Sequence, residues 1–231
     1  MRQKLASITQ SFRLPTICTL CSQFHLGTLA VCHDCQHWLR PLGPSCQHCA
    51  YPLSSVEHLI CGQCIKTKPH FDRAYIAYPF EEPLRSLLHQ FKYHNGLYLK
   101  SFLGELMLKV SIDLQGQCLI PVPMHPLRLK QRGFNQAAVL TQYLAKTLQV
   151  PYDLFSCRKI INTAPQASLD GDLRRKNLRN AFEIKALPYQ HVILIDDLLT
   201  TGSTANELAR AFKKSGVQRV DVWCCARTVY A

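Results

Sequence analysis

The sequence lacks two features that would place the chain in or across a membrane. No apolar run approaches the roughly 18 residues that a membrane-spanning helix requires. The start, Met1-Arg-Gln-Lys, also lacks the long apolar core of a secretory signal peptide. We therefore expect no membrane span and a soluble, cytoplasmic protein in a reducing environment.

Acidic residues are scarce as well. The chain has 15 Asp and Glu against 27 Lys and Arg, which gives a net charge of +12 over 231 residues. Such an excess predicts a polyanionic partner, most simply nucleic acid or polyphosphate. The alternative is a basic protein whose charge only keeps it in solution. The length suffices for one medium-sized domain and one small domain.

Cysteine is abundant, and eight of the 12 cysteines form four Cys-x-x-Cys pairs in the first 64 residues. The pairs are Cys18/Cys21, Cys32/Cys35, Cys46/Cys49 and Cys61/Cys64. Two such knuckles complete a tetrahedral site of four thiolates, so eight cysteines predict two Zn²⁺ ions. The simplest arrangement takes the first four cysteines for one ion and the last four for the other, although crossed pairing stays open.

Two other chemistries compete with zinc for these cysteines. A thioredoxin-like redox pair is disfavoured because no βαβ pattern surrounds any of the pairs. An iron–sulfur cluster remains an alternative. The segment has few large apolar residues, so bound metal is expected to supply much of its folding free energy. Cys118, Cys157, Cys224 and Cys225 stand apart in predicted strands, where we expect small buried hydrophobes.

The stretch 192–204 carries the strongest functional signal outside the cysteines. Its sequence, V-I-L-I-D-D-L-L-T-T-G-S-T, begins with four apolar residues typical of a strand buried on both faces. A helix follows, for which Thr204 and Glu207 are placed as a capping box. A strand, a tight hydroxyl-rich loop and a helix N-terminus together predict an anion site.

The two acids in this stretch indicate what accompanies the phosphate. Asp196 and Asp197 would repel an anion unless they accept hydrogen bonds from sugar hydroxyls or hold Mg²⁺. A phosphorylated ribose meets both conditions. The stretch has no Gly-Lys-Ser/Thr and is not a Walker A loop. The alternative is an ordinary strand-to-helix turn.

The remainder of the chain alternates strand and helix patterns. Strands are expected at 71–79, 118–124, 152–159, 181–184, 191–195 and 219–227, with helices at 84–91, 98–112, about 136–148 and 204–212. This order predicts an α/β fold with a mainly parallel sheet. The loop predicted at 125–135 carries Arg128, Lys130 and Arg132, and a polar loop at 162–180 carries Arg174, Arg175 and Lys176. Both loops are candidates for binding pyrophosphate or nucleic acid, the second as a mobile lid.

The stretch 192–204 resembles the phosphoribosyltransferase signature, which binds phosphoribosyl pyrophosphate (PRPP). Together with R-G-F-N-Q at 132–136, T-A-P-Q-A-S-L at 163–169, R-R-K-N at 174–177 and the cysteine pairs, it is similar to the ComF/GntX family of ComFC-type competence proteins. The resemblance implies a double zinc ribbon at 1–70, a type I phosphoribosyltransferase domain at 71–231, and a role in DNA uptake during natural transformation.

The resemblance also implies roles for individual residues. Asp196 and Asp197 would contact the ribose hydroxyls and Mg²⁺. The 5-phosphate would be held by Thr200, Thr201, Gly202, Ser203 and Thr204. The family has no established base substrate, so the resemblance implies no particular reaction.

Three functions remain open from the sequence. The first is a DNA-uptake factor that binds single-stranded DNA through the basic loops, with other competence proteins as further candidate partners. The second is an active phosphoribosyltransferase with an unknown acceptor, for which the sequence offers no clear general acid or base. The third is a regulatory protein that senses PRPP or a related phosphosugar.

Overall fold

The computed structural model describes residues 14–93, 96–114, 117–162 and 180–229. Within these residues no helix is both long and apolar enough to cross a membrane. The predicted lid residues Arg174, Arg175 and Lys176, and the T-A-P-Q-A-S-L motif at 163–169, lie outside the described residues.

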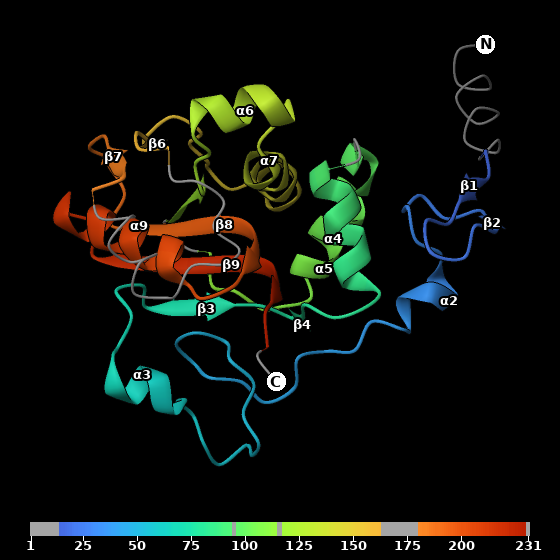
Figure 1. Cartoon of the computed structure of the whole chain (residues 1–231), viewed down its shortest axis with the longest axis horizontal. Coiled ribbons are helices and arrows are strands. Elements are labelled where there is room, and N and C mark those ends of the chain that lie inside the picture. The colour runs from blue at the N-terminus through green and yellow to red at the C-terminus, as the bar shows by residue number, and fades with distance from the viewer. Residues whose placement is uncertain (1–13, 94–95, 115–116, 163–179, 230–231) are drawn as a thin grey trace, which may run out of the picture.

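A parallel sheet forms the centre of the protein (Figure 1). Its strand order is β3 (Arg73–Tyr75), β9 (Arg219–Arg227), β8 (His191–Leu199) and β5 (Gln117–Pro121), and β4 (Tyr78–Pro79) also pairs with β9. Every pairing in this sheet is parallel. The predicted mainly parallel α/β fold is therefore confirmed.

Side chains of the central strand β8 alternate between two buried faces. Ile193 and Ile195 pack with α4 (Leu84–Tyr93), α5 (Lys100–Met107) and α7 (Gln136–Leu148). Val192 and Leu194 pack instead with α9 (Ser203–Lys214) on the opposite face. Burial on both sides explains why this strand reads as a continuous apolar run instead of an alternating one.

Smaller elements complete the domain. A 3₁₀ turn, η1 (Gly96–Leu99), leads into α5, and α6 (Pro126–Arg132) stands between β5 and α7. Two short strands, β6 (Cys157–Lys159) and β7 (Phe182–Ile184), form a separate antiparallel pair.

Several predicted elements need correction. The loop predicted at 125–135 contains helix α6, which has Pro126 in its first turn, the His125 side chain as its N-cap and Gly133 in the left-handed conformation at its C-cap. The strand predicted at 71–79 is two short strands, and the one predicted at 152–159 forms only over β6. The helix predicted at 98–112 is the shorter α5 preceded by η1.

The predicted capping box is also wrong. The N-cap of helix α9 lies two residues before Thr204, at Gly202, which is in the left-handed conformation and makes no side-chain cap bond. The Glu207 carboxylate accepts instead from the backbone N–H of Asn180 at 3.0 Å and from the guanidinium of Arg210. A tertiary partner, Asn180, and the i,i+3 neighbour Arg210 on the same helix thus replace the capping bond that the sequence pattern favours.

The cysteine-rich segment forms two ribbons that lie at different sides of the sheet (Figure 1). The first comprises β1 (Thr16–Ile17), β2 (Phe24–His25) and α2 (His33–Gln36) and lies beside α4 and α5. The second ends in α3 (Gly62–Lys66) and lies beneath β3. Backbone bonds tie it to the sheet edge, from Ala74 N–H to the His48 carbonyl and from Leu42 N–H to the Ala77 carbonyl, both at 2.8 Å. The domain boundary near residue 70 stays a prediction.

Candidate functional site

The eight paired cysteines form two separate four-sulfur clusters. Cys18, Cys21, Cys32 and Cys35 make one, and Cys46, Cys49, Cys61 and Cys64 make the other, with all Sγ atoms of a cluster within 4.8 Å of one another. The Sγ atoms of Cys21 and Cys32 are 3.9 Å apart, and those of Cys49 and Cys61 are 3.6 Å apart. Zn–S bonds of about 2.3 Å place the sulfurs of a tetrahedron about 3.8 Å apart. Both clusters therefore fit a Zn²⁺ ion, in the uncrossed arrangement.

The two clusters share a backbone feature that favours thiolates. The N–H of the third cysteine donates to the sulfur of the first, from Cys32 to Cys18 and from Cys61 to Cys46, at 3.3 Å in both cases. Burial raises the pKa of the Cys18 thiol, but backbone N–H donors led by Cys32 outweigh it and lower the pKa to about 6. The pKa of Cys46 is lowered to about 7 in the same way, against burial, by N–H donors led by Cys49. Thiolates are the form that binds metal.

The other four cysteines behave as the sequence predicts. Cys118, Cys157, Cys224 and Cys225 are all buried. Burial raises the pKa of Cys118 to about 11 and that of Cys157 to about 12. These thiols remain protonated at neutral pH and pack as small hydrophobes.

A polar cavity of about 340 Å³ opens at the carboxyl ends of β5 and β8. This edge is where ligands bind in open α/β sheets. Asp196 and Asp197 from the end of β8 line it together with Thr200 and Thr204, and the facing wall comes from α4, α6 and the start of α7.

The two carboxylates are held close to a cation. Lys92 Nζ lies 2.9 Å from Asp197 Oδ2, and the Asp197 side chain is only 7% exposed. Burial opposes the charge on Lys92, but the neighbouring Asp197 carboxylate outweighs it and raises the pKa of Lys92. Burial, and then repulsion from Asp197, raises the pKa of Asp196. The pair is therefore an unsatisfied negative site that a second cation would stabilise.

Cations dominate the facing wall of the cavity. Arg128, Arg132 and Lys159 all line it. The Arg132 guanidinium stacks 4.9 Å from the centre of the Tyr93 ring and donates to Gln136 at 3.1 Å. Burial, together with the charge of Arg128, lowers the pKa of Lys159 to about 8. An anion beside Lys159 and Arg128 would relieve this repulsion.

The loop between the acid pair and α9 is tightly folded. Gly202 adopts the left-handed conformation with φ of 75°, which a side chain at this position would strain. The hydroxyls of Thr201 and Ser203 lie 2.9 Å apart, and the Ser203 N–H donates to Thr201 Oγ1 at 3.3 Å. Helix α9 starts directly behind this loop, so its positive dipole end faces the same region.

Comparisons with known proteins bear on the same residues. A family model described as a double zinc ribbon domain matches residues 10–65. Competence protein F from Haemophilus influenzae is 34% identical over 215 residues, which cover 88% of this chain and 93% of that protein. DNA utilization protein YhgH from Escherichia coli O157:H7 is 34% identical over 227 residues, which cover 94% of this chain and 99% of that protein. The chain belongs to the ComF family. Competence protein ComFC from Bacillus subtilis is also similar, at 26% identity over 197 residues, which cover 80% of this chain and 79% of that protein.

The cavity of this ComF-family chain brings together six of the ten predicted anion-site residues that the structure describes. Asp196, Asp197, Thr200, Thr204, Arg128 and Arg132 line it, whereas Thr201, Gly202, Ser203 and Lys130 are not among its lining residues. The roles of all these residues in binding PRPP, whether or not they line the cavity, stay predictions.

Sequence reasoning did not assign three residues of the site. Lys92, Lys159 and His125 line the cavity without having been predicted as ligands. The sequence held nothing that paired Lys92 with Asp197, which lie 105 positions apart. His125 accepts from Leu127 N–H through Nδ1 at 3.3 Å, so its neutral ring carries the proton on Nε2.

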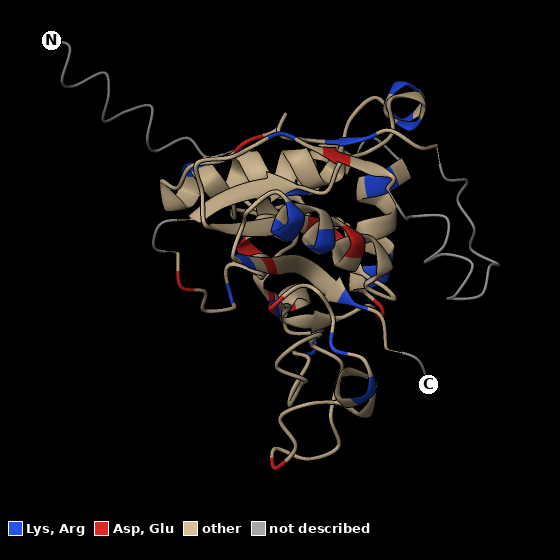
Figure 2. Ribbon diagram, turned by 90° about the vertical axis from the view of Figure 1, so that its left-hand side faces the viewer, with Lys and Arg blue, Asp and Glu red and all other residues tan. Residues whose placement is uncertain are grey.

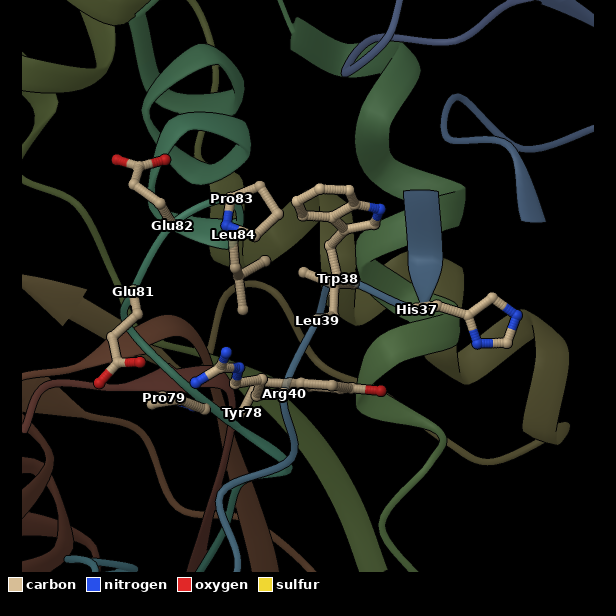
Figure 3. A pocket seen from close by; sticks show the side chains of 10 residues that line it. All are labelled: His37, Trp38, Leu39, Arg40, Tyr78, Pro79, Glu81, Glu82, Pro83 and Leu84. Atoms are coloured by element: carbon tan, nitrogen blue, oxygen red, sulfur yellow. The ribbon is translucent and has the colours of Figure 1, made fainter. Parts of the chain in front are cut away.

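A larger cavity in this ComF-family chain, of about 510 Å³, lies between the first ribbon and the start of α4 (Figure 3). The Trp38 indole and the Pro83 ring lie side by side in it, while the carboxylates of Glu81 and Glu82 point away. Its charged lining holds one cation, Arg40, against the two carboxylates of Glu81 and Glu82. The clustered cations and Thr200 and Thr204 of the hydroxyl-rich loop, and not volume, make the smaller cavity the candidate phosphate site.

Metal content tests the two cysteine clusters. We expect two zinc ions per chain, falling to one in Cys35→Ser and to one in Cys64→Ser, because each replaces the fourth ligand of a different site. Elemental analysis of purified protein measures the number. A brown, iron-containing protein, or loss of both ions from either single variant, would contradict two independent zinc sites.

The depressed pKa of Lys159 gives a pH prediction. Because Lys159 loses its charge as pH rises through about 8, affinity for inorganic pyrophosphate should fall between pH 7 and 9. Lys159→Arg stays charged and should bind about fivefold more tightly than the wild type at pH 9, but similarly at pH 6.5. Calorimetry at matched ionic strength measures the ratio. Titration of Asp196 affects both proteins equally, so identical pH profiles would rule out the role of Lys159.

Proposed function

We propose that this protein acts in the uptake and use of external DNA, that it binds single-stranded DNA in the cytoplasm, and that it binds PRPP with Mg²⁺ in the cavity beside Asp196. The DNA role is supported by the names of its relatives, which match nearly the whole chain, and by the net charge of +12. The observation that carries PRPP binding is one cavity that combines an acid pair, the two ends of the hydroxyl-rich loop at Thr200 and Thr204, and a cationic wall.

Each part of PRPP has a complementary partner in this cavity. The ribose hydroxyls would donate to Asp196 and Asp197, and the loop at 200–204 would bind the 5-phosphate at the start of α9. Arg128, Arg132 and Lys159 would face the pyrophosphate. Mg²⁺ has oxygen ligands available from the acid pair and the pyrophosphate, and it would offset the repulsion that raises the pKa of Asp196.

Lys92 makes this arrangement electrostatically feasible. Its ammonium neutralises Asp197 at 2.9 Å and so weakens the repulsion between the acid pair and an incoming polyanion. A cavity with two unpaired carboxylates would disfavour PRPP until a metal arrived.

A second candidate function is phosphoribosyl transfer to an acceptor. The observation that favours it is His125, a histidine that lines the cavity and carries a proton on Nε2 when neutral. Such a group can donate a proton to a leaving or accepting atom. Binding without turnover would instead favour a protein that senses PRPP.

Calorimetry with PRPP and Mg²⁺ tests the cavity directly. Asp196→Asn should weaken binding by at least about tenfold, because it removes a charged acceptor for the ribose hydroxyls and Mg²⁺. Glu57→Gln, at an exposed position in the second ribbon, should bind like the wild type. Pyrophosphate release from the same samples, over a panel of acceptors, distinguishes transfer from sensing. Equal binding by wild type and Asp196→Asn would contradict PRPP binding at this cavity.

The surface for DNA is expected on helix α6. Its sequence, P-L-R-L-K-Q-R, carries three basic residues, Arg128, Lys130 and Arg132. Figure 2 shows the helix standing out from the body of the protein, with blue Lys and Arg residues on it. Lys130 is exposed and does not line the phosphate cavity, whereas Arg128 and Arg132 are partly buried and do. Lys130 can therefore report on DNA without disturbing the cavity.

Salt dependence of binding to a fluorescent oligo-dT tests the DNA proposal. Affinity should fall steeply with salt, and Lys130→Gln should weaken binding and reduce the slope of log K against log salt by about 0.7, as loss of one phosphate contact does for single strands. Lys109→Gln, at an exposed position after α5, is the control and should change neither quantity. Absent or salt-independent binding by the wild type would contradict the proposal.

A further inference from the structure

Arg227, at the end of β9, is buried to 5% exposure, yet within the described part of the chain it has no carboxylate partner. Its guanidinium donates hydrogen bonds to backbone carbonyls and lies 5.7 Å from the centre of the Tyr51 ring. Nε donates to the Cys49 carbonyl at 3.0 Å, and Nη1 donates to the carbonyls of Leu199 at 3.0 Å, Thr228 at 2.9 Å and Thr200. One buried cation thus connects a cysteine of the second cluster with the start of the hydroxyl-rich loop.

The bonds to Leu199 and Thr200 orient the loop. Across a trans peptide plane the carbonyl of one residue and the N–H of the next point in opposite directions. Because Arg227 holds these two carbonyls, the N–H groups of Thr200 and Thr201 are directed away from the guanidinium. Thr228 N–H donates to the Leu199 carbonyl at 3.0 Å and further fixes the point where the loop leaves the strand.

The bond to Cys49 connects this arrangement to metal. Cys49 is a ligand candidate of the second cluster, its sulfur lies 3.6 Å from that of Cys61, and the next residue, Ala50, has φ of 53°. The direction of the Cys49 carbonyl therefore depends on the closed knuckle. A Zn²⁺ ion with four thiolates also carries a net charge of about −2, which stabilises a buried cation nearby.

The first cluster has no such connection. Cys18 and its neighbours Ala30, Val31 and Leu39 pack in the apolar core with α4 and α5. Among the described residues, no hydrogen bond of the first ribbon reaches the loop at 200–204. The two metal sites thus differ in their relation to the anion-binding loop.

We infer that Arg227 is a positioning residue through which zinc in the second cysteine cluster sets the conformation of the anion-binding loop, whereas zinc in the first cluster does not. The inference rests on the proposed function only in its consequence for phosphate binding. The conformational coupling itself concerns residues of this chain and can be measured without ligand.

Matched cysteine variants test the coupling. Cys64→Ser and Cys35→Ser each remove the fourth ligand, from the second and the first cluster respectively. Amide hydrogen exchange of residues 199–204, measured without ligand on the full chain, should accelerate about tenfold or more in Cys64→Ser and stay within about twofold in Cys35→Ser. Affinity for inorganic pyrophosphate with Mg²⁺ should change in parallel.

Arg227 variants separate positioning from general stability. With both zinc ions retained, Arg227→Gln should accelerate exchange of the same amides. Arg227→Lys should rescue only in part, because one ammonium cannot reproduce the fork of donors. In Arg227→Gln, adding Cys64→Ser should have little further effect, since the connection is already lost.

The outcomes distinguish this inference from the proposed function. Equal acceleration in Cys64→Ser and Cys35→Ser, or additive effects of Arg227→Gln and Cys64→Ser, would overturn the coupling even if PRPP binds. Selective acceleration in Cys64→Ser without pyrophosphate or PRPP binding by the wild type would support the coupling and reject the proposed ligand. Near-ultraviolet circular dichroism identifies any variant that has lost its fold.

Discussion

Two adjacent carboxylates at the end of a buried strand impose the constraint on which the cavity at the ends of β5 and β8 depends. Asp197 is almost fully buried, and burial of an unpaired carboxylate costs several kcal/mol, so a cation must come from elsewhere in the chain. Lys92 supplies it from the end of α4. The position of α4 is thereby tied to the acid pair, and its apolar face, with Leu84, Leu87, Leu88 and Phe91, is tied to the sheet.

The sequence predicts the parts of this arrangement whose determinants are local. The apolar run of β8, the adjacent acids and the small residues before α9 are all visible in thirteen residues. The cysteine spacing likewise predicts two four-sulfur clusters, because each knuckle is a local turn. In both cases the residue types and their spacing are sufficient, without knowledge of distant partners.

Contacts between distant segments set the rest, and the sequence could not show them. Lys92 and Asp197 meet only because α4 packs on the face of the sheet beside β8. Glu207 is placed for a capping box, but it binds Asn180 and Arg210, since Gly202 begins the helix first. Helix α6 was missed because about two turns of helix give too short a periodic pattern to distinguish it from a polar loop.

The positions of the two ribbons explain why this fold carries two metal sites instead of one larger core. The second ribbon buries few side chains of its own, so bound zinc is expected to be its main source of rigidity. The first ribbon packs against α4, the helix that carries Lys92. The second meets Arg227, which holds the start of the loop on the other side of the acid pair. The two ribbons therefore brace the two flanks of one cavity, by apolar packing on one side and by a buried cation on the other. The first ribbon contacts α4 through apolar packing, which can weaken by degrees. The second ribbon acts through the few directed hydrogen bonds of Arg227, which form or break together.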